Sequence, residues 1–170
     1  MAVLRITKHG EQVLKKACAP VDYAAMKAEL PQLIKDMWAT MESVRGVGLA
    51  APQIGLNIRL SVIDVKPEGR RQRLVLINPE IVSKSGTLHE EEGCLSIPGV
   101  YAKTTRASTM RIKALDALGE AYEMTGEGLL ARAFQHEIDH LDGKLFIDHL
   151  SFEHKLKVMG LIRELKPTWS

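Results

Sequence analysis

Apolar residues recur at three- and four-residue spacing in three stretches of the chain, which is the pattern of a helix with one buried face. These stretches are residues 26–44, 127–141 and 152–165. Pro31 lies inside the first stretch, so we expect that helix either to begin near Pro31 or to be kinked there. A shorter helix is expected over residues 11–18.

The middle of the chain has the residue pattern of β-strands. Val, Ile and Leu are enriched there or alternate with polar residues. The expected strands are residues 59–65, 74–78, 81–84, 110–115 and 120–125. Asp116-Ala-Leu-Gly119 has the composition of a hairpin turn between the last two. Helices, then strands, then helices favour a single α+β domain over residues 1–170, with a helix packed on an antiparallel sheet.

The composition excludes several classes of protein. Of the 170 residues, 45% are hydrophobic and 26% are charged, as in ordinary globular proteins. The net charge is +2 with the two signs interspersed, so we expect no direct nucleic-acid site. No apolar run approaches the ~20 residues of a membrane helix, and residues 1–5 lack the pattern of a secretory signal. We therefore expect a cytoplasmic protein that binds no membrane.

The strongest chemical signal is His136-Glu137-Ile138-Asp139-His140, an H-E-x-x-H sequence. On a helix, residues four apart lie on one face with Cβ atoms ~5–6 Å apart, so both imidazoles can bind one metal ion. Glu137 lies beside the pair, where its carboxylate can take a proton from water. The surrounding helix is largely apolar, and buried histidines need partners. We therefore predict a metal site with Glu137 as general acid/base.

This motif leaves the third ligand open. A longer form, H-E-x-x-H-x-x-G-x-x-H, fails here because its last position is Phe146. Glu153 or Glu164, in the last expected helix, would give the arrangement of a metalloprotease. Cys94 lies in a polar turn at a strand end, Glu91-Glu92-Gly93-Cys94-Leu95-Ser96. We favour Cys94, because a Cys-His-His site leaves a fourth position for water.

A glycine-rich segment, Gly46-Val47-Gly48-Leu49-Ala50-Ala51-Pro52-Gln53, follows the first long helix. Its small side chains let a substrate or another backbone come close. The segment is not a phosphate-binding loop, because it lacks Gly-Lys-Ser/Thr. Gln53 ends it with a neutral amide that can donate a hydrogen bond to a developing oxyanion.

Together these segments resemble the peptide deformylase family. The family motifs Gly-x-Gly-x-Ala-Ala-x-Gln, Glu-Gly-Cys-Leu-Ser and Gln-His-Glu-x-Asp-His appear in order as Gly46–Gln53, Glu92–Ser96 and Gln135–His140. The resemblance covers nearly the whole chain. It implies an α+β fold of antiparallel β-sheets packed around a central metal-binding helix, with N-terminal and C-terminal helices.

The resemblance also implies a reaction and its residues. Removal of the formyl group from the N-terminal formylmethionine of nascent polypeptides would release formate. The implied metal is iron(II), with zinc(II), nickel(II) or cobalt(II) as alternatives in the purified protein. The side chain of Gln53 and the backbone N–H of Leu95 would form the oxyanion hole, and Glu137 would be the acid/base. The implied metal ligands are Cys94, His136 and His140.

Specificity requires a pocket for the methionine side chain. The candidates for its wall are Val47, Leu129 and Ala133. Packing in the core is an equal alternative for each of these side chains. Gly48 is added as a point where the backbone can come close to the substrate. Arg132 precedes His136 by one helical turn, so we expect its stem to line the pocket and its guanidinium to reach solvent or a carboxylate. Glu92 and Arg106 are expected to form an ion pair behind the Cys94 turn.

Two other functions remain open. An endopeptidase would use Glu153 or Glu164 and would keep its metal without Cys94. A deformylase-like domain could also be a non-catalytic binding protein, although the intact Glu137 and Gln53 argue against this. The last expected helix is basic and is either an ordinary solvated face or a docking surface for the ribosome. Its cations are Lys155, Lys157, Arg163 and Lys166.

Overall fold

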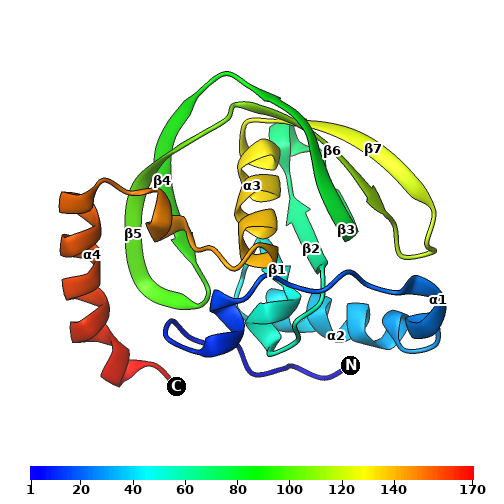
Figure 1. Ribbon diagram of the computed structural model, residues 1–170, viewed down its shortest axis with the longest axis horizontal. Coiled ribbons are helices and arrows are strands. Elements are labelled where there is room, and N and C mark those ends of the chain that lie inside the picture. The colour runs from blue at the N-terminus through cyan, green and yellow to red at the C-terminus, as the bar shows by residue number, and fades with distance from the viewer.

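The computed structural model describes residues 1–170 and arranges two antiparallel sheets around one helix (Figure 1). The helices are α1 (Tyr23–Met26), α2 (Leu30–Ser43), α3 (Leu129–Leu141) and α4 (Phe152–Leu165). The strands are β1 (Gly48–Ala50), β2 (Leu60–Val65), β3 (Gln72–Ser85), β4 (Leu88–Cys94), β5 (Ile97–Arg106), β6 (Thr109–Leu115) and β7 (Ala121–Glu127). The α+β class predicted from the sequence is confirmed.

The larger sheet has the strand order β1-β2-β3-β6-β7, and β4 pairs with β5 in a separate hairpin. All of these pairings are antiparallel. In Figure 1, α3 lies between the large sheet and the β4–β5 hairpin. The helix therefore has one face toward each sheet, and side chains from both sheets can meet on it.

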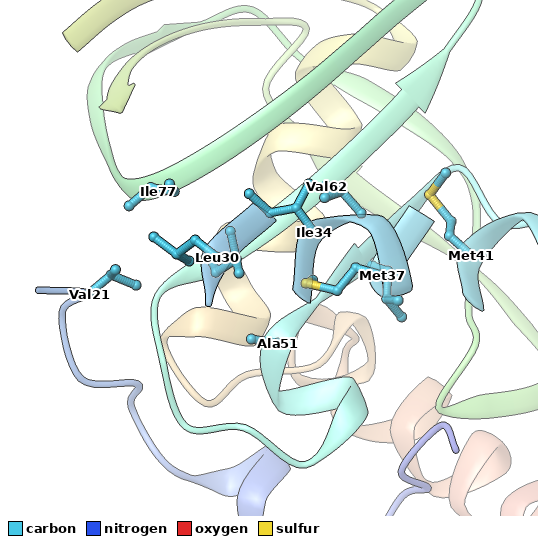
Figure 2. Close-up of a cluster of buried hydrophobic side chains, with 10 residues drawn as sticks. Val21, Leu30, Ile34, Met37, Met41, Ala51, Val62 and Ile77 are labelled. Atoms are coloured by element: carbon cyan, nitrogen blue, oxygen red, sulfur yellow. The ribbon is translucent and has the colours of Figure 1, made fainter. Parts of the chain in front are cut away.

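Strand β2 separates two hydrophobic clusters because its side chains alternate between the two faces of the sheet. Leu60 and Val62 pack with the buried face of α2 in the first cluster (Figure 2). Ile63 and Val65 point the other way and pack with α3. Helix α2 begins at Leu30 with Pro31 in its first turn, where proline lacks no needed hydrogen bond. Of the two expectations for Pro31, the helix start is confirmed.

Helix α3 is amphipathic, and its apolar face determines which residues are turned toward the hairpin. Leu130, Phe134 and Ile138 recur at four-residue spacing and are buried against the large sheet. Gly128 before the helix and Gly143 after it both have positive φ, 56° and 74°, a backbone conformation that glycine adopts readily. With the helix anchored in this way, its opposite face is presented to β4 and β5.

Two local expectations were wrong, and two strands were missed. Residues 11–18 form only a short 3-10 turn, Gln12–Lys15, because Lys16 after it is extended. The expected strands 74–78 and 81–84 are one long strand, β3, whose register shifts around Asn78 and Pro79. Strands β4 and β5 were not predicted, because charged and small residues obscure their alternation.

Helix α4 packs on the outer side of the β4–β5 hairpin. Its buried residues Val158 and Ile162 join Ile97 and Val100 of β5 and Phe146 in a third hydrophobic cluster. The helix therefore supports the strand pair that leads to Cys94. No helix of the chain combines the length and the apolar character needed to cross a membrane.

Candidate metal centre and active site

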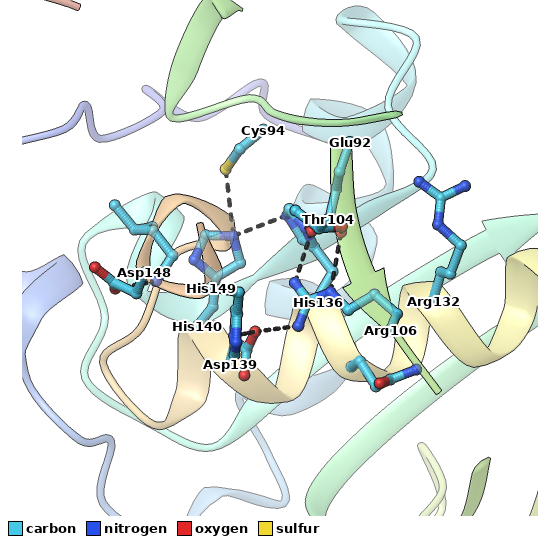
Figure 3. Close-up of polar contacts among 12 residues, drawn as sticks. Glu92, Cys94, Thr104, Arg106, Arg132, His136, Asp139, His140, Asp148 and His149 are labelled. Carbon is cyan, nitrogen blue, oxygen red and sulfur yellow. Dashed lines mark hydrogen bonds and ion pairs between the residues drawn. The ribbon is translucent and has the colours of Figure 1, made fainter. Parts of the chain in front are cut away.

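Cys94, His136 and His140 come together between the β4–β5 hairpin and α3 (Figure 3). Their potential ligand atoms all lie within 4.8 Å of one another. The two histidines lie one helical turn apart on the face of α3 that is turned away from the large sheet. Cys94 is the last residue of β4, where a register shift follows Gly93. The expected cluster of three is therefore present in the structure.

The donor atoms of this cluster fit a transition-metal ion. His140 Nε2 lies 3.4 Å from Cys94 Sγ and 3.2 Å from His136 Nε2. Two ring nitrogens and a sulphur thus face one small space, and this N/S donor set is typical of zinc and iron sites. Burial alone would raise the pKa of the Cys94 thiol, but the neighbouring imidazoles of His140 and His136 lower it to about 5. The sulphur is therefore a thiolate at neutral pH, the form that binds metals.

A buried carboxylate holds the ring of His136. Glu92 Oε2 lies 2.6 Å from His136 Nδ1, so Nδ1 carries the hydrogen and Nε2 presents a lone pair to the cluster. Arg106 donates to both oxygens of Glu92, at 3.0 and 2.7 Å. Burial opposes ionisation, but the hydrogen bonds of His136 and Arg106 hold the pKa of Glu92 well below its usual value. The Glu92–Arg106 ion pair expected from the sequence is present.

The sequence reasoning missed the rest of this polar network. Arg106 Nη1 also donates to Asp139 Oδ2 at 2.6 Å, and His149 Nε2 lies 2.7 Å from the same oxygen. Thr104 Oγ1 donates to Glu92 Oε1 at 2.7 Å. Asp139 lies between the two histidines of the cluster in sequence and could have been recognised by that position. Thr104 and His149 carry no local signal.

Glu137 lies beside the cluster in a confined position. Its side chain is buried, and Oε2 has no hydrogen-bond partner within the protein. A Cβ atom placed on Gly48 would overlap the Glu137 carboxylate, so only glycine fits at this position of β1. Burial raises the pKa of the Glu137 carboxyl, which makes it a stronger proton acceptor.

Gln53 and Leu95 lie on the other side of Cys94. The Gln53 amide is fixed by the Ala50 N–H, which donates to its Oε1 at 2.9 Å. Its Nε2 is directed to Cys94 Sγ at 3.6 Å and Ser96 Oγ at 3.2 Å. Leu95 lies in the β4–β5 turn, and its backbone N–H donates no hydrogen bond there. Both residues thus have an N–H group close to the cluster.

A cleft of about 620 Å³ opens onto these residues. The side chains of Val47 and Leu129 line it and are 50% and 44% exposed, so neither is a core residue. Ala133 lines the cleft and also packs in the α3 core. Gly48 forms part of the wall next to Glu137. The cleft is therefore apolar at the residues that the sequence offered for a substrate side chain.

Arg132 joins α3 to β4 at the edge of the cleft. Its Nη1 donates to Glu90 Oε2 at 2.7 Å, and its Nη2 donates to the Glu91 carbonyl. The side chain also lines the cleft. The guanidinium therefore binds a carboxylate, as expected from the sequence, and the residue is part of the cleft wall.

The two alternative ligands do not join the cluster. Glu153 and Glu164 are on α4, which packs against β5, and both are exposed. The residues that come together as a potential metal site are Cys94 and the two histidines. This arrangement does not fit the endopeptidase alternative.

Known proteins resemble this chain over nearly all of its length. The family model described as polypeptide deformylase matches residues 3–156. A peptide deformylase from Alkalilimnicola ehrlichii is 49% identical over 166 residues, covering 98% of this chain and 90% of that protein.

Solved structures show the same similarity. A crystal structure of a peptide deformylase from Legionella pneumophila has 46% sequence identity and a TM-score of 0.90, covering 98% of this chain and 97% of that one. A peptide deformylase from Acinetobacter baumannii, solved with Met-Ala-Ser bound, has 36% identity and a TM-score of 0.82, covering 88% of this chain and 99% of that one. The chain therefore belongs to the polypeptide deformylase family, the metal-dependent hydrolases that remove the N-formyl group from the formylmethionine of nascent peptides.

Proposed function

We propose that this chain deformylates nascent peptides with Cys94, His136 and His140 as metal ligands and Glu137 as the acid/base. The observation that carries the proposal is the convergence of two imidazoles, a thiolate and a buried carboxylate at the end of one cleft. The bound metal would supply Lewis-acid chemistry, which lowers the pKa of water and polarises a carbonyl.

The protein residues account for the proton transfers of this hydrolysis. Glu137 takes a proton from the attacking water, whose oxygen forms the new bond to the formyl carbon. When the C–N bond breaks, Glu137 returns that proton to the leaving nitrogen, so formate and a free amino terminus result. The unpartnered Glu137 Oε2 is consistent with this role, since no protein group competes for its lone pairs.

Gln53 and Leu95 form the oxyanion hole in this proposal. The Gln53 Nε2 amide and the Leu95 N–H donate to the formyl oxygen as it gains charge. One such donor contributes about 3 kcal/mol. The Ala50 N–H holds the other end of the Gln53 amide in place, so that only the long Nε2 contact to Cys94 Sγ has to be exchanged for the formyl oxygen.

The apolar part of the cleft binds the methionine side chain. Val47 and Leu129 are exposed in the free protein, and Ala133 completes the wall between them and His136. Covering exposed apolar surface stabilises the complex by about 25 cal/mol per Å². The Met-Ala-Ser peptide of the Acinetobacter structure has the same first residue. Arg132 closes this pocket with its aliphatic stem.

Replacement of Arg132 by alanine tests its part in the pocket. Arg132→Ala removes the stem and the bonds to Glu90 and Glu91, so we expect KM for formyl-Met peptides to rise severalfold with a smaller change in kcat. Steady-state kinetics measures this. An unchanged KM across several formyl-peptides would exclude Arg132 from the pocket.

Formate release decides the activity. Anaerobically purified, iron(II)-loaded protein is given formyl-Met-Ala-Ser, with acetyl-Met-Ala-Ser as the control substrate. We expect rapid release from the formyl peptide only, lost in Glu137→Gln. A folded, metal-loaded protein that releases no formate would contradict the proposal.

Iron(II) is the metal that we propose for the working enzyme. Zinc(II) binds such ligands more tightly than iron(II) does, so the metal found after purification does not identify the active one. Formate release after anaerobic loading with iron(II) and with zinc(II), nickel(II) or cobalt(II) compares them directly. Faster formate release by the zinc(II)-loaded protein than by the iron(II)-loaded protein would contradict the proposal of iron(II).

We propose that the enzyme acts in the cytoplasm and docks on the ribosome through α4. The exposed residues Lys157 and Arg163 have no ion-pair partner, so their charges are available for ribosomal phosphates. Lys157→Glu with Arg163→Glu should reduce co-sedimentation with ribosomes, whereas Lys27→Glu should not. Equal co-sedimentation of both variants would leave α4 as an ordinary solvated face.

A further inference from the structure

The cleft carries two cations for which the proposed chemistry has no use. Lys8 and Arg45 line it together with Arg132. Arg132 is neutralised by Glu90, but neither Lys8 nor Arg45 forms an ion pair with any acid of the chain. A cation that lines a binding cleft without a partner favours a negative charge on the ligand.

Lys8 is held in the wall of the cleft. Its Nζ donates one hydrogen bond, to the Ile6 carbonyl at 3.1 Å, which leaves two of its three hydrogens for other acceptors. The nearby acid, Glu11, is already paired with Arg5 at 2.7 Å. Burial and the positive charge of Arg5 lower the pKa of Lys8, and the negative charges of Glu11 and Cys94 oppose this shift.

Arg45 occupies a second place, immediately after α2. Its backbone is left-handed, with φ of 53°, and its N–H donates to the Glu42 carbonyl at 3.1 Å. The backbone is therefore fixed, while the exposed guanidinium makes no hydrogen bond, not even to the last carbonyls of the helix. The neighbouring Val44 and Val47 also line the cleft and are exposed.

The acids that line the cleft do not balance these charges. Glu92 is paired with Arg106, and Glu137 belongs to the metal centre. Glu91 lines the cleft, is exposed and forms no ion pair, so it is one unpaired acid against the two unpaired cations. Two unpaired cations and one unpaired acid leave a net positive charge on the walls of the cleft, and the two cations belong to segments that are distant in sequence.

We propose that Lys8 and Arg45 select substrates with an aspartate or glutamate among the residues that follow the formylmethionine. This inference rests on the proposed deformylase activity and adds a preference within it. A peptide that starts with formylmethionine at the metal must extend along the cleft, because the apolar pocket and the metal centre fix its first residue. Its later side chains then pass the walls that carry the two cations.

A positional scan of peptides tests the preference. The reference is formyl-Met-Ala-Ala-Ala, and aspartate or lysine replaces each alanine in turn. At low ionic strength we expect aspartate to raise kcat/KM about three- to fivefold at one or more positions, mainly through KM, as for a partly exposed ion pair. Lysine at the same position should lower kcat/KM, and added salt should reduce both effects.

Variants assign the effect to residues. Lys8→Gln and Arg45→Gln should each bring the aspartate-to-alanine ratio toward one at the position that the residue reads. Arg45→Glu should reverse the preference in favour of lysine. Lys27→Gln, the same loss of charge at an exposed site outside the cleft, should keep the native ratio.

The outcomes separate the two proposals. Equal kcat/KM for aspartate, alanine and lysine at every position would overturn the charge preference, while formate release from the reference peptide would still support deformylation. A preference that survives in both Lys8→Gln and Arg45→Glu would also overturn it. No formate release from any peptide would contradict the proposed function itself.

Discussion

At the scale of single residues, the site depends on contacts between segments distant in sequence. Gly48 and Glu137 are separated by about half of the chain, yet a Cβ atom on Gly48 would overlap the Glu137 carboxylate. In the same way, Arg106 reaches Glu92 and Asp139 from a different strand. Small changes at these positions should therefore act on chemistry more than on folding.

Gly48→Ala should abolish activity with little loss of metal. The new methyl group would overlap Glu137 and displace its carboxylate, and a displacement of about 1 Å can reduce a rate 100-fold. Formate release and metal content measure the two effects. Gly160→Ala on α4, where an added Cβ meets nothing, is the matched control and should keep full activity. Normal turnover by Gly48→Ala would mean that Glu137 is not fixed as described.

Arg106→Met should weaken metal binding by about 10- to 100-fold, the usual effect of losing a partner behind a ligand. The loss of Arg106 leaves the buried negative charges of Glu92 and Asp139 without their positive partner. Glu92 then holds the His136 ring less firmly. Competition with a chelator measures the affinity. Arg111→Met removes an exposed arginine paired with Glu123 and should have no effect; equal affinities for the two variants would contradict the positioning role.

At the scale of elements, α3 has two faces with different tasks. Phe134 is fully buried against the large sheet, whereas Leu129 is 44% exposed in the cleft. The same helix is thus anchored by one face, and its other face carries the proposed metal ligands and residues that line the cleft.

Replacing one residue on each face of α3 should separate stability from binding. Phe134→Ala should lower the free energy of unfolding by about 3–5 kcal/mol, because it leaves a cavity in the core. Leu129→Ala should cost much less stability but raise KM for formyl-Met peptides. Denaturant unfolding and kinetics on both variants test this, and a loss of stability from Leu129→Ala equal to that from Phe134→Ala would contradict it.

Elements whose signal is local were predicted well. Helix α4 was predicted at its observed bounds, Phe152–Leu165, and the histidine pair needed only the helical repeat. Strand β4 was missed because Leu88–Cys94 is acidic and only Glu92 in it is buried; its pairing with β5 comes from tertiary context, which outweighs β-propensity. Cys94 was favoured as the third ligand because of its polar turn, and the family resemblance then implied the same choice; no local rule joins Cys94 to His140, which is 46 residues later.

At the scale of the whole molecule, α4 is part of the support for the active site. Val158 and Ile162 pack against the strand that follows the Cys94 turn. Deleting residues 152–170 would therefore expose Ile97 and Val100 as well as removing charges. Changes of single exposed residues are the sounder way to study the surface of this helix.

Ile162→Ala should show the structural contribution of α4. The side chain is 3% exposed, so its truncation should lower the free energy of unfolding by about 2–4 kcal/mol. Leu161→Ala is the control on the same helix, because Leu161 is 46% exposed and should change stability little. Similar values for the two would mean that α4 is not anchored through this cluster.

The proposed metal ligands come from two parts of the fold: Cys94 is on the β4–β5 hairpin, and both histidines are on α3, which packs on the large sheet. A bound ion would thus be a cross-link between these two parts of the fold, as a disulfide is in a secreted protein. Chelation should then accelerate amide hydrogen exchange first in residues 88–106, and less in β2 and β3, whose pairing does not involve the ion. The ion that takes part in the reaction would in this way also hold the β4–β5 hairpin and α3 together at the base of the cleft.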